Sequence, residues 1–364
     1  MTHHENLFDP ALMGDLTLPN RVLMAPLTRN RAQGDGVPRD IAQTYYTQRS
    51  SAGLILTEAA QISAMGKGYL DTPGIHTDAQ IAGWKTITDA VHAAGGRIFC
   101  QLWHVGRISH VSLLPEGRQP VSSTDTAAKA QTFTANGFED TSEPQALDAE
   151  GIAQTLKDYA TAARAAKDAG FDGVEVHAAN GYLIDQFLQD GVNDRGDAYG
   201  GSVEGRMKFL MEALDAVETV WRPERIGVRL SPLGQANDMS DSDPETHYAR
   251  IYAALSARKL AYLHVVEQFP GNEDDAGVQI LRRLRRHYDG FYIANGGYDA
   301  GSAERAIASG HADAVTFGRD FIANPDLPER FRRGADLNPQ DPDTFYGGGR
   351  EGYTDYPFLE TEPA

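Results

Sequence analysis

Strand-like and helix-like segments alternate along almost the whole chain, and this alternation restricts the fold more than any other sequence feature. Short apolar runs predict strands over residues 21–27, 53–59, 97–103, 170–177, 225–232, 260–267, 290–297 and 312–319. Amphipathic segments predict helices over residues 40–52, 78–95, 149–169, 203–221, 243–259, 276–287 and 300–309, and a last helix after Pro325. Strands and helices in this order indicate βα units around a parallel sheet.

The number of these units decides between two architectures. Eight βα units close most naturally into a (β/α)8 barrel, the TIM barrel of the α/β class. The alternative is an open, doubly wound sheet, which usually has fewer units and a GxGxxG turn after its first strand. The chain lacks that turn. A barrel can hold 364 residues in one domain and no change in composition indicates a linker, so we expect a single domain over residues 1–364.

Two segments lie outside the βα pattern. Residues 7–19 predict a short N-terminal hairpin that turns at Gly14-Asp15 and plugs the bottom of the barrel. Residues 104–148 form a long insertion after the third strand, rich in Ser, Thr, Gly and Pro. Because long loops in compact domains are usually lids or binding elements, we expect this insertion to be a lid.

Charge and cysteine content exclude several classes of protein. The formal net charge of −18 would repel phosphate backbones and anionic lipids, so nucleic acids and membranes are not expected partners. One cysteine, Cys100, cannot build an intramolecular disulfide or a multi-thiolate site, and no histidine has plausible metal-ligand spacing. No apolar run reaches the roughly 20 residues of a membrane span, and the first residues lack signal-peptide features. We expect a cytoplasmic protein without a metal.

Two glycine-containing turns follow the last two predicted strands, at the end of a barrel where active sites lie. The seventh strand ends in Asn295-Gly296-Gly297 and the eighth in Gly318-Arg319. Glycines let backbone N–H groups approach an anion closely, and an arginine adds a forked cation. Together they predict a phosphate site. Taken singly, either turn could instead be a tight βα connection with a surface cation.

Other predicted strand ends carry uncharged polar groups and one cation. Thr28 follows the first strand, Gln101 lies in the third and Arg229 in the fifth. A flavin ring takes amide-type partners at its pyrimidine edge and benefits from a nearby cation when it is reduced. Gln101 and Arg229 fit these needs, although simple polarity of a barrel layer would also explain them.

A third group follows the fourth strand. His177 and Asn180 lie three residues apart, so one helical turn would place both side chains on one side. Two uncharged donors that converge suit an oxygen that gains negative charge during a reaction. Tyr182, with an ordinary pKa near 10, is a candidate proton donor. A core histidine, a turn asparagine and an aromatic cap remain the structural alternatives.

Seven longer motifs resemble one family. They are NRVLMAPLTRNRA (20–32), TEAAQISAMGKGY (57–69), QLWHVGRISH (101–110), VHAANGYLIDQFL (176–188), YGGSVEGR (199–206), FGRDFIANPDL (317–327) and YGGGREGYTDYP (346–357). In these motifs the chain resembles the Old Yellow Enzyme family of FMN-dependent ene-reductases. The resemblance is to its bacterial branch, which includes N-ethylmaleimide, morphinone and nitrate-ester reductases.

The resemblance implies roles for individual residues. Non-covalent FMN would be bound by Pro26, Leu27, Thr28, Ala59, Gln101, Arg229, Gly297, Gly318 and Arg319. The implied catalytic set is His177 and Asn180 for the substrate oxygen, Tyr182 as proton donor and Thr28 at the flavin. The pocket walls would be Tyr69, Trp103, Phe269 and Tyr353. The chain departs from the branch at Asn180, where a second histidine is frequent, and other family members use the same His/Asn pair.

The implied reaction is a two-step cycle in which NADPH or NADH reduces FMN and an electron-poor alkene then oxidises it. Enones, maleimides and nitroalkenes are the implied substrates, and the enzyme would act as a monomer or small homo-oligomer. Two alternatives belong to other classes. One is a flavin-free barrel isomerase or aldolase that binds a sugar phosphate, and the other is a non-catalytic flavin-binding protein.

Overall fold

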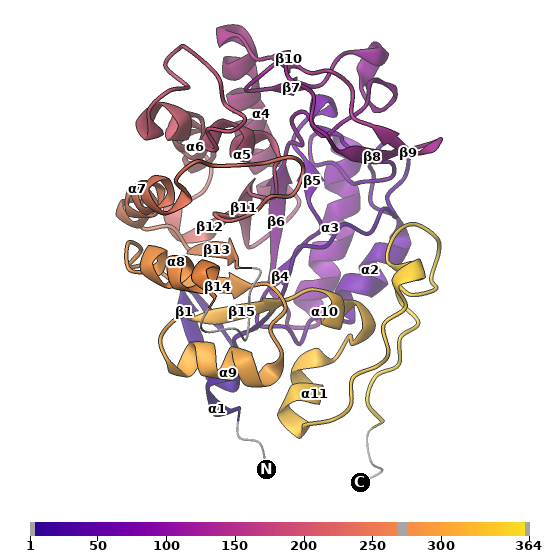
Figure 1. The fold of residues 1–364 in the computed structure, drawn as a ribbon. Coiled ribbons are helices and arrows are strands. Elements are labelled where there is room, and N and C mark those ends of the chain that lie inside the picture. The colour runs from indigo at the N-terminus through magenta and orange to yellow at the C-terminus, as the bar shows by residue number, and fades with distance from the viewer. Residues whose placement is uncertain (1–3, 268–274, 361–364) are drawn as a thin grey trace.

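The computed structural model describes residues 4–267 and 275–360, and in this part the predicted strands form a closed parallel barrel (Figure 1). Each strand pairs in parallel with the next, and the last pairs with the first. The strands are β3 (Val22–Met24), β4 (Ile55–Leu56), β6 (Ile98–Trp103), β11 (Gly173–Ala178), β12 (Ile226–Leu230), β13 (Tyr262–Val266), β14 (Tyr292–Asn295) and β15 (Ala314–Phe317). The predicted (β/α)8 barrel is confirmed.

The second predicted strand, 53–59, is wrong in its details, because the structure divides it. β4 ends at Leu56, and a separate strand β5 (Ala60–Gln61) pairs with the outer half of β6. The residues between them make other hydrogen bonds. The Glu58 N–H donates to Tyr46 Oη at 3.0 Å, and the Glu58 carboxylate accepts the Arg29 N–H at 3.3 Å. Glu58 is therefore bonded to the Tyr46 side chain and the Arg29 backbone instead of continuing the strand.

The helices surround the barrel in Figure 1. They are α2 (Asp40–Thr47), α3 (Asp78–Ala93), α4 (Ala149–Asp168), α6 (Val203–Glu218), α7 (Pro244–Ala257), α8 (Ala276–Arg285), α9 (Ala300–Ala308) and α11 (Leu327–Arg333). Most ends agree with prediction because the caps are local: Thr77, Asp148, Ser202, Asp243, Asp275 and Asp299 each accept a first-turn N–H. The helix predicted over 40–52 ends early, at Thr47, and turns follow it.

Three short helices were not predicted. α1 (Glu5–Phe8), α5 (Leu183–Leu188) and α10 (Arg319–Ala323) have only four to six residues each. A segment of that length gives no readable 3.6-residue period. Among the described helices, none combines the length and the apolar character that crossing a membrane would require.

The N-terminal hairpin closes one end of the barrel, as predicted. β1 (Ala11–Met13) and β2 (Leu16–Leu18) pair antiparallel around the Gly14-Asp15 turn. Its apolar side chains join a buried cluster inside the barrel, which we call the lower layer: Met13, Leu18, Leu23, Leu54, Leu56, Phe99, Ala261, Tyr262, Ile293 and Ala314.

Two glycines make room for the large rings of the lower layer. A Cβ at Gly227 would lie 2.1 Å from the Tyr262 ring, and one at Gly173 would lie 2.3 Å from the Phe99 ring. Any larger residue there would force a ring out of place. A second and larger apolar cluster lies between the strands and the surrounding helices, so the barrel is packed on both sides of its wall.

The 104–148 insertion contains its own secondary structure. β8 (Gln131–Thr134) and β9 (Gly137–Asp140) form an antiparallel hairpin, and β7 (Val121–Ser122) pairs in parallel with β10 (Gln145–Ala146). The insertion lies at one end of the molecule in Figure 1, beside β5 and α5. The Arg107 guanidinium donates to Asp238 O at 2.9 Å, which ties the insertion to the loop after β12.

Candidate active site

A ring of polar side chains lies above the lower layer, and all of them are buried except Asn295, which is partly exposed. We call it the polar ring: Gln101, Glu175, Arg229, His264, Asn295 and Thr316. Gln101 Nε2 donates to Glu175 Oε1 at 2.6 Å, and Glu175 Oε2 lies 2.8 Å from His264 Nδ1. Interior positions recur every second residue along a strand. Gln101 and Glu175 therefore follow Phe99 and Gly173 on the inside of the barrel, and the register pairs them directly.

The polar ring continues across the other strands. His264 Nε2 lies 2.9 Å from Thr316 Oγ1. On the next strands, Asn295 Nδ2 donates to Thr316 O at 3.2 Å and Arg229 Nη2 donates to Asn295 Oδ1 at 2.8 Å. Hydrogen bonds thus connect residues from six barrel strands, which is the arrangement that a buried polar layer needs to be stable.

Arg229 keeps unused hydrogen-bonding capacity. Its side chain is almost fully buried, yet its Nε–H has no acceptor in the part of the chain that the structure describes. Burial lowers the pKa of Arg229, and the nearby Glu175 carboxylate acts against that shift. A buried, unsatisfied cationic donor at a barrel mouth is suited to an acceptor atom of a ligand.

Above the polar ring lies an aromatic cluster formed by Tyr69, Trp103, His177 and Tyr182. The Tyr182 ring stands nearly perpendicular to both the Trp103 ring, at 4.9 Å between centroids, and the His177 ring, at 5.2 Å. The Tyr69 ring stacks on Trp103 at 5.8 Å. The hydroxyls of Tyr69 and Tyr182 are 3.1 Å apart. Four residues predicted for the site are therefore in ring contact with one another.

His177 is held as a neutral donor. Burial, and after it the charge of Arg229, lower the pKa of His177 well below its ordinary value of 6.5. Its Nδ1 accepts the Ala179 N–H at 3.3 Å, so the proton of the neutral ring is on Nε2. Burial raises the pKa of Tyr182 above 10, while the hydrogen bond with Tyr69 acts in the opposite direction. Both groups therefore carry a proton at neutral pH.

The loop that carries Asn180 has a special backbone. Asn180 has a φ of +57° and is followed by Gly181 with a φ of +78°, a turn that brings the chain sharply around. The Asn180 N–H donates to Ser231 Oγ at 2.7 Å, and Asn237 Nδ2 donates to Asn180 O at 2.8 Å. The Asn180 backbone is thus fixed, while its amide side chain makes no hydrogen bond within the described residues.

Sequence reasoning missed two residues that hold this loop, Asp185 and Gln186 in α5. Asp185 Oδ2 accepts the Gly181 N–H at 2.9 Å, and Gln186 Nε2 donates to Gly181 O at 2.7 Å and to Val105 O at 3.0 Å. Burial raises the pKa of Asp185 to about 6. The signal was a polar Asp-Gln pair inside an apolar segment, since such residues are buried only when they are hydrogen-bonded.

The predicted phosphate turns lie at the ends of β14 and β15. Gly296 and Gly297 have φ values of +133° and +79°, and Gly318 directly precedes α10. Arg319 is exposed and makes no hydrogen bond with the described part of the chain. Of the remaining predicted FMN contacts, Ala59 is buried, whereas the three that follow β3 are partly exposed: Pro26, Leu27 and Thr28.

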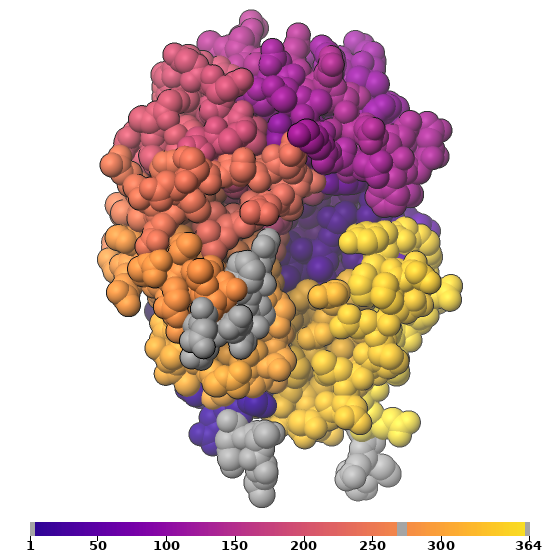
Figure 2. Space-filling view, in the orientation of Figure 1, coloured from indigo at the N-terminus to yellow at the C-terminus, as the bar shows by residue number. Residues whose placement is uncertain are grey.

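Figure 2 shows the face on which these strand ends open. A recess on this face is bounded by the magenta insertion, an orange segment and the yellow C-terminal segment, and indigo residues from early in the chain lie on its floor. The unpartnered Arg229 Nε–H, the glycine turns and the uncommitted Arg319 together offer a cation, backbone donors and a phosphate partner. These residues fit FMN.

Two predicted wall residues have different outcomes. Phe269 lies outside the described residues. Tyr353 is fully buried and stacks on Tyr45 at 4.1 Å, with the Arg29 guanidinium 5.0 Å from its ring. The structure does not bring Tyr353 into the aromatic cluster. Tyr346, from the same C-terminal motif, is 67% exposed and close enough to raise the pKa of both Tyr69 and Tyr182 electrostatically. Sequence reasoning missed it.

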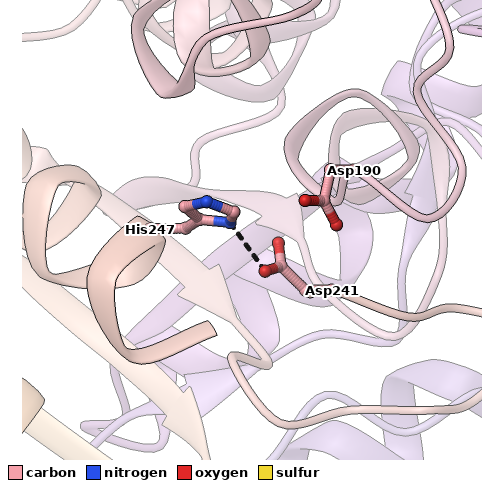
Figure 3. A group of neighbouring side chains, drawn as sticks. All are labelled: Asp190, Asp241 and His247. Carbon is pink, nitrogen blue, oxygen red and sulfur yellow. Dashed lines mark hydrogen bonds and ion pairs between the residues drawn. The ribbon is translucent and has the colours of Figure 1, made fainter. Parts of the chain in front are cut away.

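Three titratable side chains converge outside this site, as Figure 3 shows: Asp190, Asp241 and His247. Their polar atoms already have protein partners, since His247 Nδ1 lies 2.6 Å from Asp241 Oδ1 and both Asp190 oxygens accept hydrogen bonds from Ser242. The Arg206 guanidinium lies 2.9 Å from His247 Nδ1 and places a positive charge where a metal ion would have to approach. We interpret the group as a junction between α6 and the start of α7.

Known proteins resemble this chain over nearly its full length. Residues 6–338 match the NADH:flavin oxidoreductase / NADH oxidase family. A putative 12-oxophytodienoate reductase 11 of Oryza sativa subsp. japonica is 44% identical over 362 residues, which cover 98% of each chain. Morphinone reductase in complex with tetrahydroNAD is 50% identical, with a TM-score of 0.92 over 97% of this chain and 98% of that one. An old yellow enzyme homologue from Zymomonas mobilis is 43% identical, with a TM-score of 0.93 over 97% and 99%.

These matches confirm the family that the sequence motifs indicated, and with it the fold and the enzyme class. The cofactor prediction is confirmed at the same level, FMN with a nicotinamide coenzyme. The chain belongs to the NADH:flavin oxidoreductase / NADH oxidase family, the FMN-dependent oxidoreductases that include the Old Yellow Enzymes.

Proposed function

We propose that this protein is an NAD(P)H-dependent ene-reductase that reduces the activated C=C bond of α,β-unsaturated carbonyls, maleimides and nitroalkenes. One observation carries the proposal: a neutral His177 and a protonated Tyr182 lie in ring contact directly above the polar ring. A neutral donor binds an oxygen that gains charge, and a neighbouring phenol supplies a proton. The names of the relatives, reductases of oxo compounds, agree with this chemistry.

The residues proposed to hold FMN lie on or just after β3, β4, β6, β12, β14 and β15. Arg319 and the glycine turns are the candidates for the phosphate, and Gln101 with Arg229 for the ring, alongside Pro26, Leu27, Thr28 and Ala59. FMN, when bound, supplies the two-electron chemistry that passes reducing equivalents from the nicotinamide to the alkene. Arg229 stabilises negative charge at the ring through its unpaired Nε–H.

Side chains of the protein bind the substrate and supply the proton. His177 Nε2–H and the Asn180 amide donate to the substrate oxygen, which draws electron density from the double bond. Tyr182 Oη delivers its proton to the α-carbon, and Tyr69, 3.1 Å away, orients the hydroxyl. Tyr69 and Trp103 wall the pocket. Tyr346, exposed beside them, is the better candidate than Tyr353 for a wall residue on the C-terminal segment.

The proposal is tested on the purified protein in three steps. An oxidised flavin spectrum and FMN released by heat, identified by mass, are expected first. Anaerobic NADPH or NADH should bleach the spectrum, and 2-cyclohexenone or N-ethylmaleimide should restore it with stoichiometric alkene reduction. A protein without flavin would support the isomerase or aldolase alternative. A flavin that the nicotinamide bleaches but no alkene reoxidises would exclude the ene-reductase.

We further propose the setting in which the enzyme acts. The whole chain, residues 1–364, forms one FMN-binding barrel domain with 104–148 as its lid, in a cytoplasmic monomer or small homo-oligomer. The single closed barrel and the hydrogen bonds between the insertion and the loop after β12 support this proposal. Light scattering would give the oligomeric state, and limited proteolysis with and without substrate would show whether the insertion becomes protected.

A further inference from the structure

The hydrogen bonds of the polar ring determine the orientation of the Gln101 side-chain amide. No local sequence pattern could predict this orientation. Glu175 is fully buried and its carboxylate can only accept hydrogen bonds. The Gln101 atom 2.6 Å from it must therefore be the amide nitrogen, and the Gln101 oxygen is turned away from Glu175. On the other side, His264 contributes its Nδ1–H and receives the Thr316 hydroxyl at Nε2.

The charge of the same carboxylate also acts on Arg229, which lies on the neighbouring strand β12. The negative charge of Glu175 opposes the effect of burial on the pKa of Arg229, and the two charges act on each other in a layer that water barely reaches. Burial keeps His264 from ionising, so it does not neutralise Glu175. Within the polar ring, Glu175 therefore offsets part of the positive charge that Arg229 presents to the barrel mouth.

We propose that Glu175 is a positioning and tuning residue for the flavin. It presents the Gln101 carbonyl oxygen, an acceptor, to the N–H of the flavin pyrimidine edge, and it lowers the flavin reduction potential by offsetting the charge of Arg229. The proposal goes beyond the ene-reductase function and rests only on FMN binding, which the family establishes. It would hold for any oxidant that the enzyme uses.

The first experiment measures the flavin potential in Glu175→Gln, which keeps the shape and removes the charge. Reduction adds negative charge to the flavin, so an Arg229 without its counter-charge stabilises the reduced form. We expect the equilibrium to shift at least tenfold toward reduced flavin, about 30 mV for a two-electron couple. If FMN bound to Glu175→Gln kept the wild-type reduction potential, Glu175 would have no tuning role. The measurement needs no alkene, so it does not depend on the proposed ene-reductase activity.

Thr316→Val is the matched control. It removes the hydroxyl at the far end of the same hydrogen-bond chain and changes no charge. We expect its flavin equilibrium to stay within about threefold of wild type. An equal shift in both variants would show that loosening of the layer, and not the charge of Glu175, moves the potential.

A second measurement uses the wild-type protein, so that it stands even where Glu175→Gln fails to fold. 3-Methyl-FMN lacks the ring N–H that an acceptor at Gln101 would bind. We expect apoprotein to bind it at least tenfold more weakly than FMN, because the Gln101 oxygen then has no donor and meets a methyl group. Equal affinity for both flavins would contradict the orientation that we assign to Gln101.

Discussion

The two layers inside this barrel are built on the same strands and have opposite chemistry. On β6 the interior positions are Phe99, Gln101 and Trp103, and on β13 they are Tyr262 and His264, so two residues separate an apolar layer from a polar one. The lower layer packs against the N-terminal hairpin. The aromatic cluster packs against Ala128 and Ala130 of the insertion. One end of the barrel is thus packed for stability, and the other carries the residues proposed for binding and chemistry.

The physical cost of the two layers also differs. Apolar side chains in the lower layer gain free energy simply by leaving water, about 25 cal/mol per Å². Glu175, His264 and Arg229 lose their hydration on burial, and only hydrogen bonds within the polar ring compensate for that loss. Stability should therefore be sensitive to changes of polarity in the polar ring and to changes of side-chain volume in the lower layer. Five variants, one of them double, test this contrast.

The largest effect is expected for His177→Ala combined with Asn180→Ala. Each donor to a developing oxyanion is worth about 10²–10³ in rate, so alkene reduction should fall by roughly 10⁴-fold for every alkene. Stopped-flow reoxidation of the reduced enzyme measures it. Asn6→Ala, which removes an amide on α1 that donates to Glu304 on α9, is the control. A loss below tenfold in the double variant would mean that the substrate oxygen binds elsewhere.

Tyr182→Phe should give the next largest effect. Enone reduction is expected to fall by roughly 10²–10⁴-fold, the range for a lost general acid, whereas nitroalkenes should suffer less because a nitronate can take its proton from water. Flavin reduction by the nicotinamide should stay within a few-fold. Tyr69→Phe keeps the proposed donor and should cost less. Equal slowing of both half-reactions in Tyr182→Phe would make Tyr182 a structural residue.

Part of the pH dependence of stability should originate at Glu58, which follows β4. Burial raises the pKa of Glu58 from 4.5 to about 7. The folded chain thus holds this proton more tightly than the unfolded chain, so the contribution of Glu58 to stability is fully present below pH 4.5 and falls by about 3 kcal/mol as the pH rises to 7. Glu58→Gln should flatten that part of the curve in urea titrations. Glu204→Gln, an exposed control, should leave it unchanged.

Arg319→Ala tests the phosphate turn. A charge-assisted hydrogen bond contributes about 1.5–3 kcal/mol, so FMN should dissociate roughly 10- to 100-fold more readily, while flavin-saturated enzyme reacts at near the wild-type rate. Arg222→Ala removes the same charge beside Asp15 in the hairpin, at the opposite end of the barrel, and should not change FMN affinity. Identical affinities in both variants would place the phosphate away from Arg319.

Gly227→Ala probes the lower layer and should have the smallest effect. The new methyl group would lie 2.1 Å from the Tyr262 ring, and such overpacking costs about 1–3 kcal/mol of unfolding free energy. Urea unfolding measures the loss, and Gly34→Ala, which meets nothing within 4 Å, is the control. Half-reaction rates of the folded variant should match wild type. A changed flavin potential would show that the two layers are coupled.

Much of this protein was readable from its sequence because the relevant information is local. Alternating apolar and amphipathic segments determined the barrel, and side-chain caps such as Thr77 and Asp148 determined where helices begin. The glycine turns and the His177-Asn180-Tyr182 segment marked the candidate site, because backbone conformation and residue chemistry leave a trace over a few neighbouring positions. The short helices and the break between β4 and β5 left none.

Only the tertiary structure decided which distant groups meet. Glu175 and His264 are 89 residues apart, and only barrel closure brings them to 2.8 Å. The same holds for the choice between Tyr346 and Tyr353, seven residues apart in one motif, of which one is exposed beside the aromatic cluster and the other buried against Tyr45. Burial and pairing depend on contacts across the sheet, and a local pattern does not contain them.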